Sequence, residues 1–359
     1  MSWKDSFFTY IWIFNVGRGL SVFIRTALNQ GIIYDFGCSD EFSPTNFIKK
    51  HLLPNLDNYD SKHKIAQSII SHPHLDHISE IESLQDSHSL FYAHLHTCPH
   101  DKFTSGMPDE RIDWARINNP ADSEVKIKTY RNLYEGERRK LPLQTILYSS
   151  SRSIPNLEYG IYYIRPPKVA ELFPEDNQKY SNSISMVLFY RQGQHTLLIP
   201  GDIMPEALDY LLEEKIGCEK RYTIFDKLQS LNHPMWHQKS CDQPSLRNCL
   251  KTHGLTVLVA PHHGLESGYS DALYTSIKGG KPNLVVISEK RHVSDTNGQV
   301  EKLYQKQDGA HGLMVNSEST SEIRYSVSTR EGHILVVFPG TGQPRAYIDQ
   351  DPEKLLGKI

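Results

Sequence analysis

The sequence has few cysteines, no long apolar run and almost no net charge. Its five cysteines are odd in number and form no Cys-x-x-Cys pair, which argues against a disulfide framework and a cysteine-based zinc knuckle. No stretch reaches the roughly 18 consecutive apolar residues of a membrane span, so we expect no membrane association. Lys and Arg number 39 against 42 Asp and Glu, and the net charge of −3 excludes a protein that coats nucleic acid by bulk positive charge.

The amino-terminal segment also lacks the features of a secretion signal. Residues 1–17 contain one lysine, a short apolar run and no small-residue cleavage site. We therefore interpret the apolar run Phe8–Phe14 as a buried strand. Together with the cysteine pattern, this favours a soluble protein of the reducing cytoplasm.

Strand-like segments form two clusters with helical segments between them. The expected strands are 10–14, 21–26, 31–34, 65–70, 159–165, 183–190, 195–199, 256–260 and 284–288, and 322–338 is expected to form a closing hairpin. Helices are expected at 78–84 and 205–214. This order predicts an α/β or α+β layered fold. We expect a single domain over residues 1–359, with polar insertions at about 97–150 and 215–252.

Histidine is the residue type whose spacing points to chemistry. The chain has 18 histidines, and the segment Ser71-His72-Pro73-His74-Leu75-Asp76-His77 directly follows the apolar strand 65–70. His72 and His74 alternate along an extended chain, so both side chains can point to one side. Asp76 and His77 fall where the chain turns into a helix and can face a second position. Two metal ions about 3.5–4 Å apart can share a hydroxide, and these ligand types suit zinc or a similar ion.

Two further strands end in acidic or histidine side chains. The strand 195–199 runs into Gly201-Asp202, and the strand 256–260 runs into His262-His263-Gly264. Layered α/β folds commonly place active sites at the carboxyl ends of strands. We therefore expect these segments and the histidine motif to meet at one edge.

The order of these motifs resembles the metallo-β-lactamase superfamily, and more narrowly the hydrolase domain of ComEC-type DNA-uptake competence proteins. The resemblance covers residues 10–338 and runs through Asn15–Leu20, Asp35-Phe36-Gly37, the histidine motif, Asn182-Ser183, Gly201-Asp202, His262-His263-Gly264 and Ile287-Ser288. The competence protein's membrane channel and oligonucleotide-binding domain have no counterpart here, so a stand-alone hydrolase is expected.

The chain also departs from the family pattern at two places. Asn15 and Leu20 replace acidic residues of the first turn, which puts any role of that turn in doubt. Lactamases carry a third histidine on the first metal, and here Asn182 or Ser183 occupies roughly that region. His94 or His96 could substitute for it.

The resemblance implies a four-layer αββα sandwich and a role for each motif residue. His72 and His74 would bind one metal, Asp76, His77 and His262 the other, and Asp202 would bridge the two. Asp35 would not bind a metal itself but would orient the side chains that do. Asp76 and Asp202 are the expected catalytic carboxylates. The candidate substrate-binding residues are Asn182, Ser183, His263, Ser267 and Arg18.

The expected activity is hydrolysis by a metal-activated hydroxide, with two divalent ions, Zn²⁺ or Mn²⁺, as cofactors. The resemblance favours a phosphodiesterase or nuclease acting on nucleic acid or a nucleotide. The basic segment 126–140 could contact phosphates, although such a run is commonly a solvated helix face. One alternative is a hydrolase of a small ester, thioester or amide. Another is an effector module of a multiprotein system, such as a defence system, with the insertions as docking surfaces.

Overall fold

The computed structural model describes most of the chain outside the two expected insertions. The described residues are 7–17, 19–59, 63–84, 94–96, 125–126, 128–130, 146–151, 154, 156–164, 166–213, 236–238, 244–289 and 300–359. Most of the insertion at 97–150, much of the one at 215–252, and the candidate residue Arg18 lie outside them. The same holds for the basic segment 126–140 beyond residue 130.

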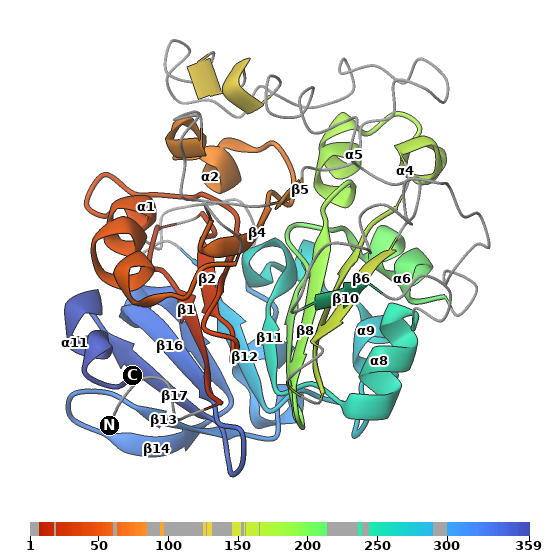
Figure 1. The fold of residues 1–359 in the computed structure, drawn as a ribbon. Helices are drawn as coiled ribbons and strands as arrows, with labels where there is room; N and C mark the ends of the chain where they lie inside the picture. Colours follow the sequence, from red (N-terminus) through yellow and green to blue (C-terminus); the bar gives the residue numbers. More distant parts are fainter. Residues whose placement is uncertain are drawn as a thin grey trace.

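Two mixed β-sheets dominate the described part of the chain (Figure 1). The first has the order β14 (Ser321–Arg324), β13 (Leu313–Asn316), β17 (Arg345–Asp349), β16 (His333–Phe338), β1 (Thr9–Ile13), β2 (Val22–Arg25), β3 (Gly31–Tyr34), β4 (Ile65–Ile69) and β5 (His94–His96). The second has the order β10 (Trp236–Gln238), β6 (Ile146–Ser151), β7 (Leu157–Tyr162), β8 (Val187–Gln192), β9 (His195–Ile199), β11 (Val257–Val259), β12 (Leu284–Ile287) and β15 (Ser326–Ser328).

Short helices connect these strands. They are α1 (Pro44–Phe47), α2 (Leu75–Ile78), α4 (Pro166–Leu172), α5 (Asn177–Ser183), α6 (Pro205–Leu212), α8 (Leu246–His253), α9 (Asp271–Ser276), α10 (Lys302–Gln305) and α11 (Pro352–Leu356). Residues Ile48–Leu52 continue α1 as a turn of π-helix. None of the helices in the described ranges has the length and apolar character needed to cross a membrane. The mixed α/β content expected from the sequence is thus present.

Alternate side chains of the central strands enter two different cores. In β1, Ile11 and Ile13 belong to a core shared by both sheets, and Trp12 packs on the opposite face. In β9, Leu197 enters the shared core and Leu198 the outer one. This alternation follows from the period of two along a strand. Because both faces are buried, these strands read as nearly continuous apolar runs.

Helices supply the apolar residues that cover the outer faces. Phe47 of α1 packs with Trp12 and Phe14 behind the first sheet, with ring centroids 5.6 and 5.7 Å apart. Leu208 of α6 and Leu250 of α8 belong to the outer core, as does Leu198 of the second sheet. The two sheets therefore face each other and carry helices on their outer sides (Figure 1).

The structure corrects three expectations about local structure. The segment 183–190 does not open as a strand, because α5 runs to Ser183 and β8 begins at Val187. Residues 322–338 are not a hairpin, since β15 pairs with β12 in the second sheet while β16 pairs with β1 in the first. The expected helix 78–84 is instead the end of α2 followed by a 3₁₀ turn. For β15 and β16, partners distant in sequence decide the pairing.

Parallel pairing brings several strand ends to one edge. In the first sheet β3 is parallel to β4, and in the second sheet β9, β11 and β12 are parallel neighbours. Asp35 follows β3, and the histidine motif follows β4. Asp202 follows β9, and His262-His263 follow β11. The polar segments singled out in the sequence therefore share strand ends of the same sense.

Candidate metal centre

The histidine motif covers the loop after β4 and the first residues of α2. His74 is the residue before the first turn of α2, and its own backbone is extended. The alternation of His72 and His74 brings His72 Nε2 within 3.0 Å of His74 Nδ1. Both side chains are buried, with exposures of 0% and 3%. Two imidazole nitrogens this close together are of the type that binds zinc and similar ions.

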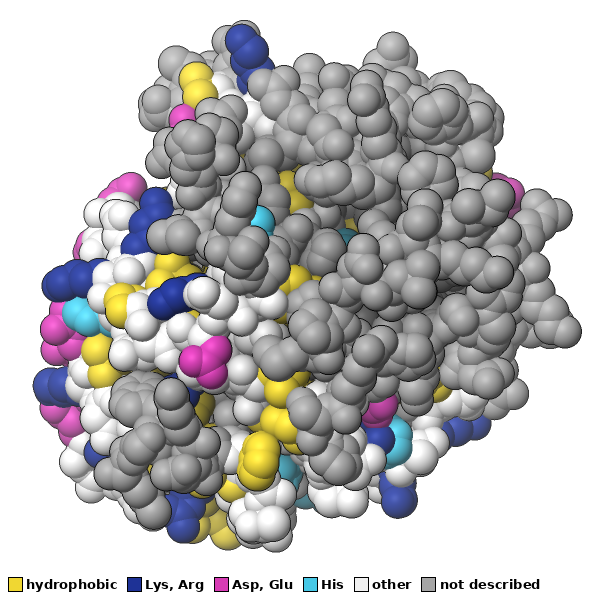
Figure 2. Space-filling view, viewed as in Figure 1, with side chains coloured by type: hydrophobic (Ala, Val, Ile, Leu, Met, Phe, Trp, Pro, Cys, Tyr) yellow, Lys and Arg dark blue, Asp and Glu magenta, His cyan; other side chains and the backbone are white. Residues whose placement is uncertain are grey.

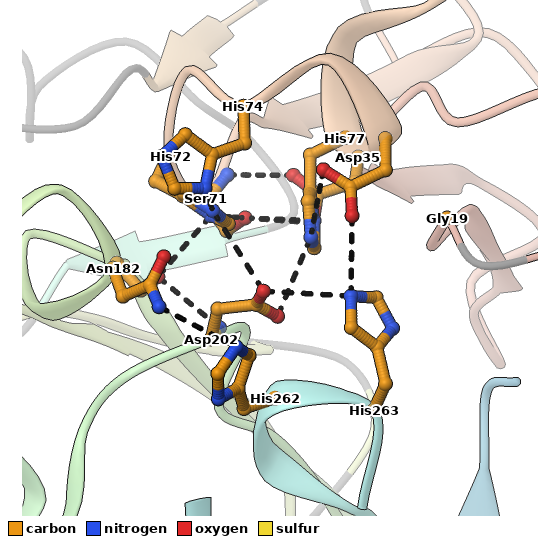
Figure 3. Close-up of polar contacts among 12 residues, drawn as sticks. Gly19, Asp35, Ser71, His72, His74, His77, Asn182, Asp202, His262 and His263 are labelled. Carbon is orange, nitrogen blue, oxygen red and sulfur yellow. Dashed lines mark hydrogen bonds and ion pairs between the residues drawn. The ribbon is translucent and has the colours of Figure 1, made fainter. Parts of the chain in front are cut away.

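Four other ligand atoms converge beside this pair. Asp76, His77, Asp202 and His263 each offer one atom, and the four atoms lie within 4.8 Å of one another. These residues could therefore hold a metal ion. Figure 3 shows Asp202 in the middle, with His72 and His74 on one side of it and His263 on the other.

The separations between these atoms match those around a metal ion. Nε2 of His263 lies 3.4 Å from an oxygen of Asp76 and 3.4 Å from an oxygen of Asp202. Nε2 of His77 lies 3.3 Å from the other oxygen of Asp202. Metal–ligand bonds of about 2.1 Å at tetrahedral angles would place two ligand atoms about 3.4 Å apart.

The Nε2 atoms of His77 and His263 face the carboxylates of Asp76 and Asp202. Nε2 of His77 and Nε2 of His263 are buried and make no hydrogen bond of acceptable geometry to any described residue. Buried polar atoms are normally satisfied, so such atoms call for an explanation. A cation between them and the carboxylates would supply it. The donor set of imidazoles and carboxylates also fits zinc or manganese.

Asp35 and Ser71 support the site from behind. Asp35 accepts hydrogen bonds from the backbone N–H of Ser71 at 2.6 Å and from the Ser71 hydroxyl at 2.7 Å. Its Oδ2 lies 2.7 Å from Nδ1 of His77. This contact favours a proton on Nδ1 and leaves Nε2 to face Asp202. The orienting role expected for Asp35 thus has a geometry that suits it.

Ser185 supports the cluster at His72 and Asp202. Its hydroxyl lies 3.4 Å from Nδ1 of His72 and accepts a hydrogen bond from the backbone N–H of Asp202 at 3.2 Å. Gly201, with φ of 64°, makes the turn before Asp202, and a Cβ there would lie 2.9 Å from the Tyr34 hydroxyl. Sequence reasoning missed both Ser71 and Ser185. Ser71 adjoins the motif and could have been suspected, whereas Ser185 is connected to it only by tertiary contacts.

The paired histidines occupy a strained turn. His262 and His263 have φ of 49° and 59°, a left-handed conformation that non-glycine residues rarely adopt. The turn directs the two rings to different places. His263 joins the four-residue group, whereas His262 lies with Nδ1 3.0 Å from the Ser267 hydroxyl and Nε2 3.5 Å from Nδ2 of Asn182. Strain of this kind is commonly stored at functional sites.

Charge coupling sets the protonation of the cluster. Burial opposes protonation of His77 and His263, but the nearby carboxylates outweigh it: they raise the pKa of His77 well above its ordinary value and that of His263 to about 9. Burial would likewise raise the pKa of Asp202, yet His263 and His77 hold it well below the ordinary value. His72 differs, because burial and the charges of His77 and His74 lower its pKa. Protons on His77 and His263 therefore balance the carboxylates without metal.

Asp76 is the most accessible member of the group. Its side chain is 30% exposed, against 6% for Asp202 and His263. The cluster thus reaches solvent mainly through Asp76.

The remaining candidates take varied positions. Asn182 and Ser183 end helix α5 and are buried, and their Oδ1 and Oγ atoms have no hydrogen-bond partner in the described ranges. Ser267 contacts His262, as noted. His96 lies in β5, where its Nε2 contacts Oε1 of Gln67 at 2.5 Å. His94 belongs to the same strand.

Comparisons with known proteins do not assign this chain to a family. No protein-family model matches this chain, and a search of the curated proteins found no relative. The chemistry of the site must therefore be argued from its own residues.

Proposed function

We propose that this protein is a metal-dependent hydrolase with a metallo-β-lactamase-type sandwich fold. Two sheets that share a core and carry helices on their outer faces support the proposed fold. The motif order described above supports it as well. The observation that carries the proposed function is the convergence of Asp76, His77, Asp202 and His263 on one point.

The proposed site holds two divalent ions, Zn²⁺ or Mn²⁺. His72 and His74 would hold one ion, and Asp76, His77 and His263 would hold the other. Asp202 would lie between them, since one of its oxygens is 3.4 Å from His263 and 3.9 Å from His72. His263 takes the place that the family resemblance assigns to His262, because its Nε2 faces both carboxylates.

Divalent ions at these positions would lower the pKa of water, so that hydroxide is available at neutral pH, and would stabilise negative charge on the substrate. The protein's own groups have separate tasks. Asp35 holds the His77 ring, and Ser185 holds the backbone of Asp202. The exposed edge of Asp76 marks the direction from which a substrate enters.

A phosphodiester in nucleic acid or a nucleotide is the favoured substrate, on the resemblance to competence-type hydrolases. The described side chains on the face shown in Figure 2 carry charges of both signs. Figure 2 shows Lys and Arg interspersed with Asp and Glu on the side that carries α1 and α11, where Lys50 and His51 lie beside Glu353. We therefore place the substrate contacts close to the metal cluster.

The test combines metal analysis with cleavage assays on the purified protein. The substrates are bis-p-nitrophenyl phosphate, single-stranded DNA and plasmid, each with Zn²⁺ or Mn²⁺. The double variant His72→Ala, Asp76→Ala should lose bound metal and activity, and the surface variant His51→Ala should keep both. A wild-type protein that binds no divalent metal would refute the proposal. Binding of metal with cleavage of p-nitrophenyl acetate alone would instead favour the small-ester alternative.

A further inference from the structure

Two sequence motifs outside the metal cluster meet in the structure. The described residues 15–17 and 19–20 and the Ile287-Ser288 pair are more than 260 residues apart in the chain. The hydroxyl of Ser288 nevertheless donates a hydrogen bond of 2.6 Å to the backbone carbonyl of Gly19. Ser288 follows β12 and is 2% exposed. A buried contact between these motifs requires a structural reason.

Gly19 in turn contacts the main chain of Asp76. Gly19 packs directly on the backbone carbonyl of Asp76, and a Cβ on Gly19 would lie 2.3 Å from that oxygen. Gly37 approaches the same oxygen, and its Cβ would lie 2.5 Å away. The backbone N–H of Leu20 donates to this carbonyl at 3.1 Å. The two glycines are thus required for space at the main chain of Asp76.

The position of the Asp76 side chain depends on this enclosure of its main chain. The His77 ring is fixed at Nδ1 by Asp35, and the backbone of Asp202 is fixed by Ser185. The Asp76 carboxylate faces His77 and His263, which are the groups it would share a metal ion with. The direction of the Asp76 carboxylate therefore depends on the position of the Asp76 main chain.

We propose that Ser288 is a positioning residue for the Asp76 half of the metal centre, acting through Gly19. It connects the end of β12 in the second sheet to Gly19, which packs on the main chain of Asp76 in α2. The inference rests on the proposed function, since it concerns the affinity of that half for a divalent ion. Groups that hydrogen-bond to metal ligands commonly change metal affinity by about 10- to 100-fold. We expect the lower end of this range here, because Ser288 reaches Asp76 through Gly19.

The experiment measures Zn²⁺ dissociation constants by competition with a chromophoric chelator. Reference variants His72→Asn and His263→Asn assign each constant to one half of the site. The test variants are Ser288→Ala and Gly19→Ala. Ser276→Ala is the matched control, because Ser276 is also buried and its hydroxyl donates to a backbone carbonyl, that of Ala272, at 2.7 Å. Thermal melts of the metal-free proteins check that each variant is folded.

The expected result is tenfold or greater weakening of the constant assigned to the Asp76 half in both test variants. The constant of the His72 half and both constants of Ser276→Ala should stay within about twofold of wild type. If the folded Ser288→Ala and Gly19→Ala variants bind both ions as wild type does, the inference is wrong. Equal weakening of both constants also contradicts it, because it indicates a general structural effect. A wild type that binds no metal refutes the proposed function itself, which is a different outcome.

Discussion

Replacing Asp35 with asparagine should weaken metal binding without removing the fold. The residue sits at φ of 59°, a left-handed conformation that asparagine tolerates well. The backbone N–H of Ser71 donates to Oδ1, so the carboxamide must keep its oxygen there. Its NH₂ group then takes the position of Oδ2, which lies 2.7 Å from Nδ1 of His77.

This exchange reverses the polarity of the contact with His77. A carboxylate at Oδ2 favours a proton on Nδ1 and leaves Nε2 with a lone pair for a metal. An NH₂ group instead requires Nδ1 to accept, which moves the proton to Nε2. The loss expected for a group in this position is about 10- to 100-fold in metal affinity, or about 1.4–2.7 kcal/mol. Burial raises the pKa of Asp35 despite the opposing effects of His77 and Ser71. The buried charge therefore carries a desolvation penalty, which the substitution removes. For this reason the metal-free variant should stay folded.

The assay is chelator competition with Zn²⁺, together with a thermal melt of the metal-free protein. Asp209→Asn is the control, since Asp209 also accepts a hydrogen bond from a serine hydroxyl, that of Ser270, at 2.6 Å. A folded Asp35→Asn protein that binds zinc as tightly as wild type would show that the tautomer argument is wrong.

Three further predictions concern protons and support. As the pH is raised toward 9, metal affinity should rise by more than tenfold per pH unit, because the ion must displace protons from His77 and from His263, whose pKa is raised to about 9. Isothermal titration in buffers of different ionisation enthalpy would detect the released protons. An affinity that does not change with pH would contradict their presence. Burial lowers the pKa of His333 to about 4, so the unfolded chain binds more protons between about pH 6.5 and 4 and stability falls with falling pH. The advantage of wild type over His333→Gln in urea unfolding should therefore shrink by about 3 kcal/mol from pH 7 to 4, and a constant difference would count against this. Ser185→Ala should weaken zinc binding by about tenfold, since its hydroxyl contacts both His72 and the backbone of Asp202; unchanged zinc constants would leave Ser185 with a purely structural role.

Much of the strand content followed from local sequence. The expected strands 31–34 and 195–199 are β3 and β9, and most others differ at their ends by one to three residues. The histidine motif was also recognisable, because alternation along an extended chain is enough to bring His72 and His74 together. The failures occurred where pairing partners are distant, as for β15, which joins the second sheet while its sequence neighbours β14 and β16 join the first.

The sequence by itself predicted that side chains able to bind a metal follow several apolar strands. Apolar runs that end in histidine or aspartate are local features, and hydrophobic periodicity reveals them. Tertiary structure alone decided which of the paired histidines faces the carboxylates, because a left-handed turn separates the directions of His262 and His263. It also decided that Ser288 contacts Gly19 and that Gly19 packs on Asp76. Such contacts depend on how two sheets pack against each other, and no local pattern of residues records that packing.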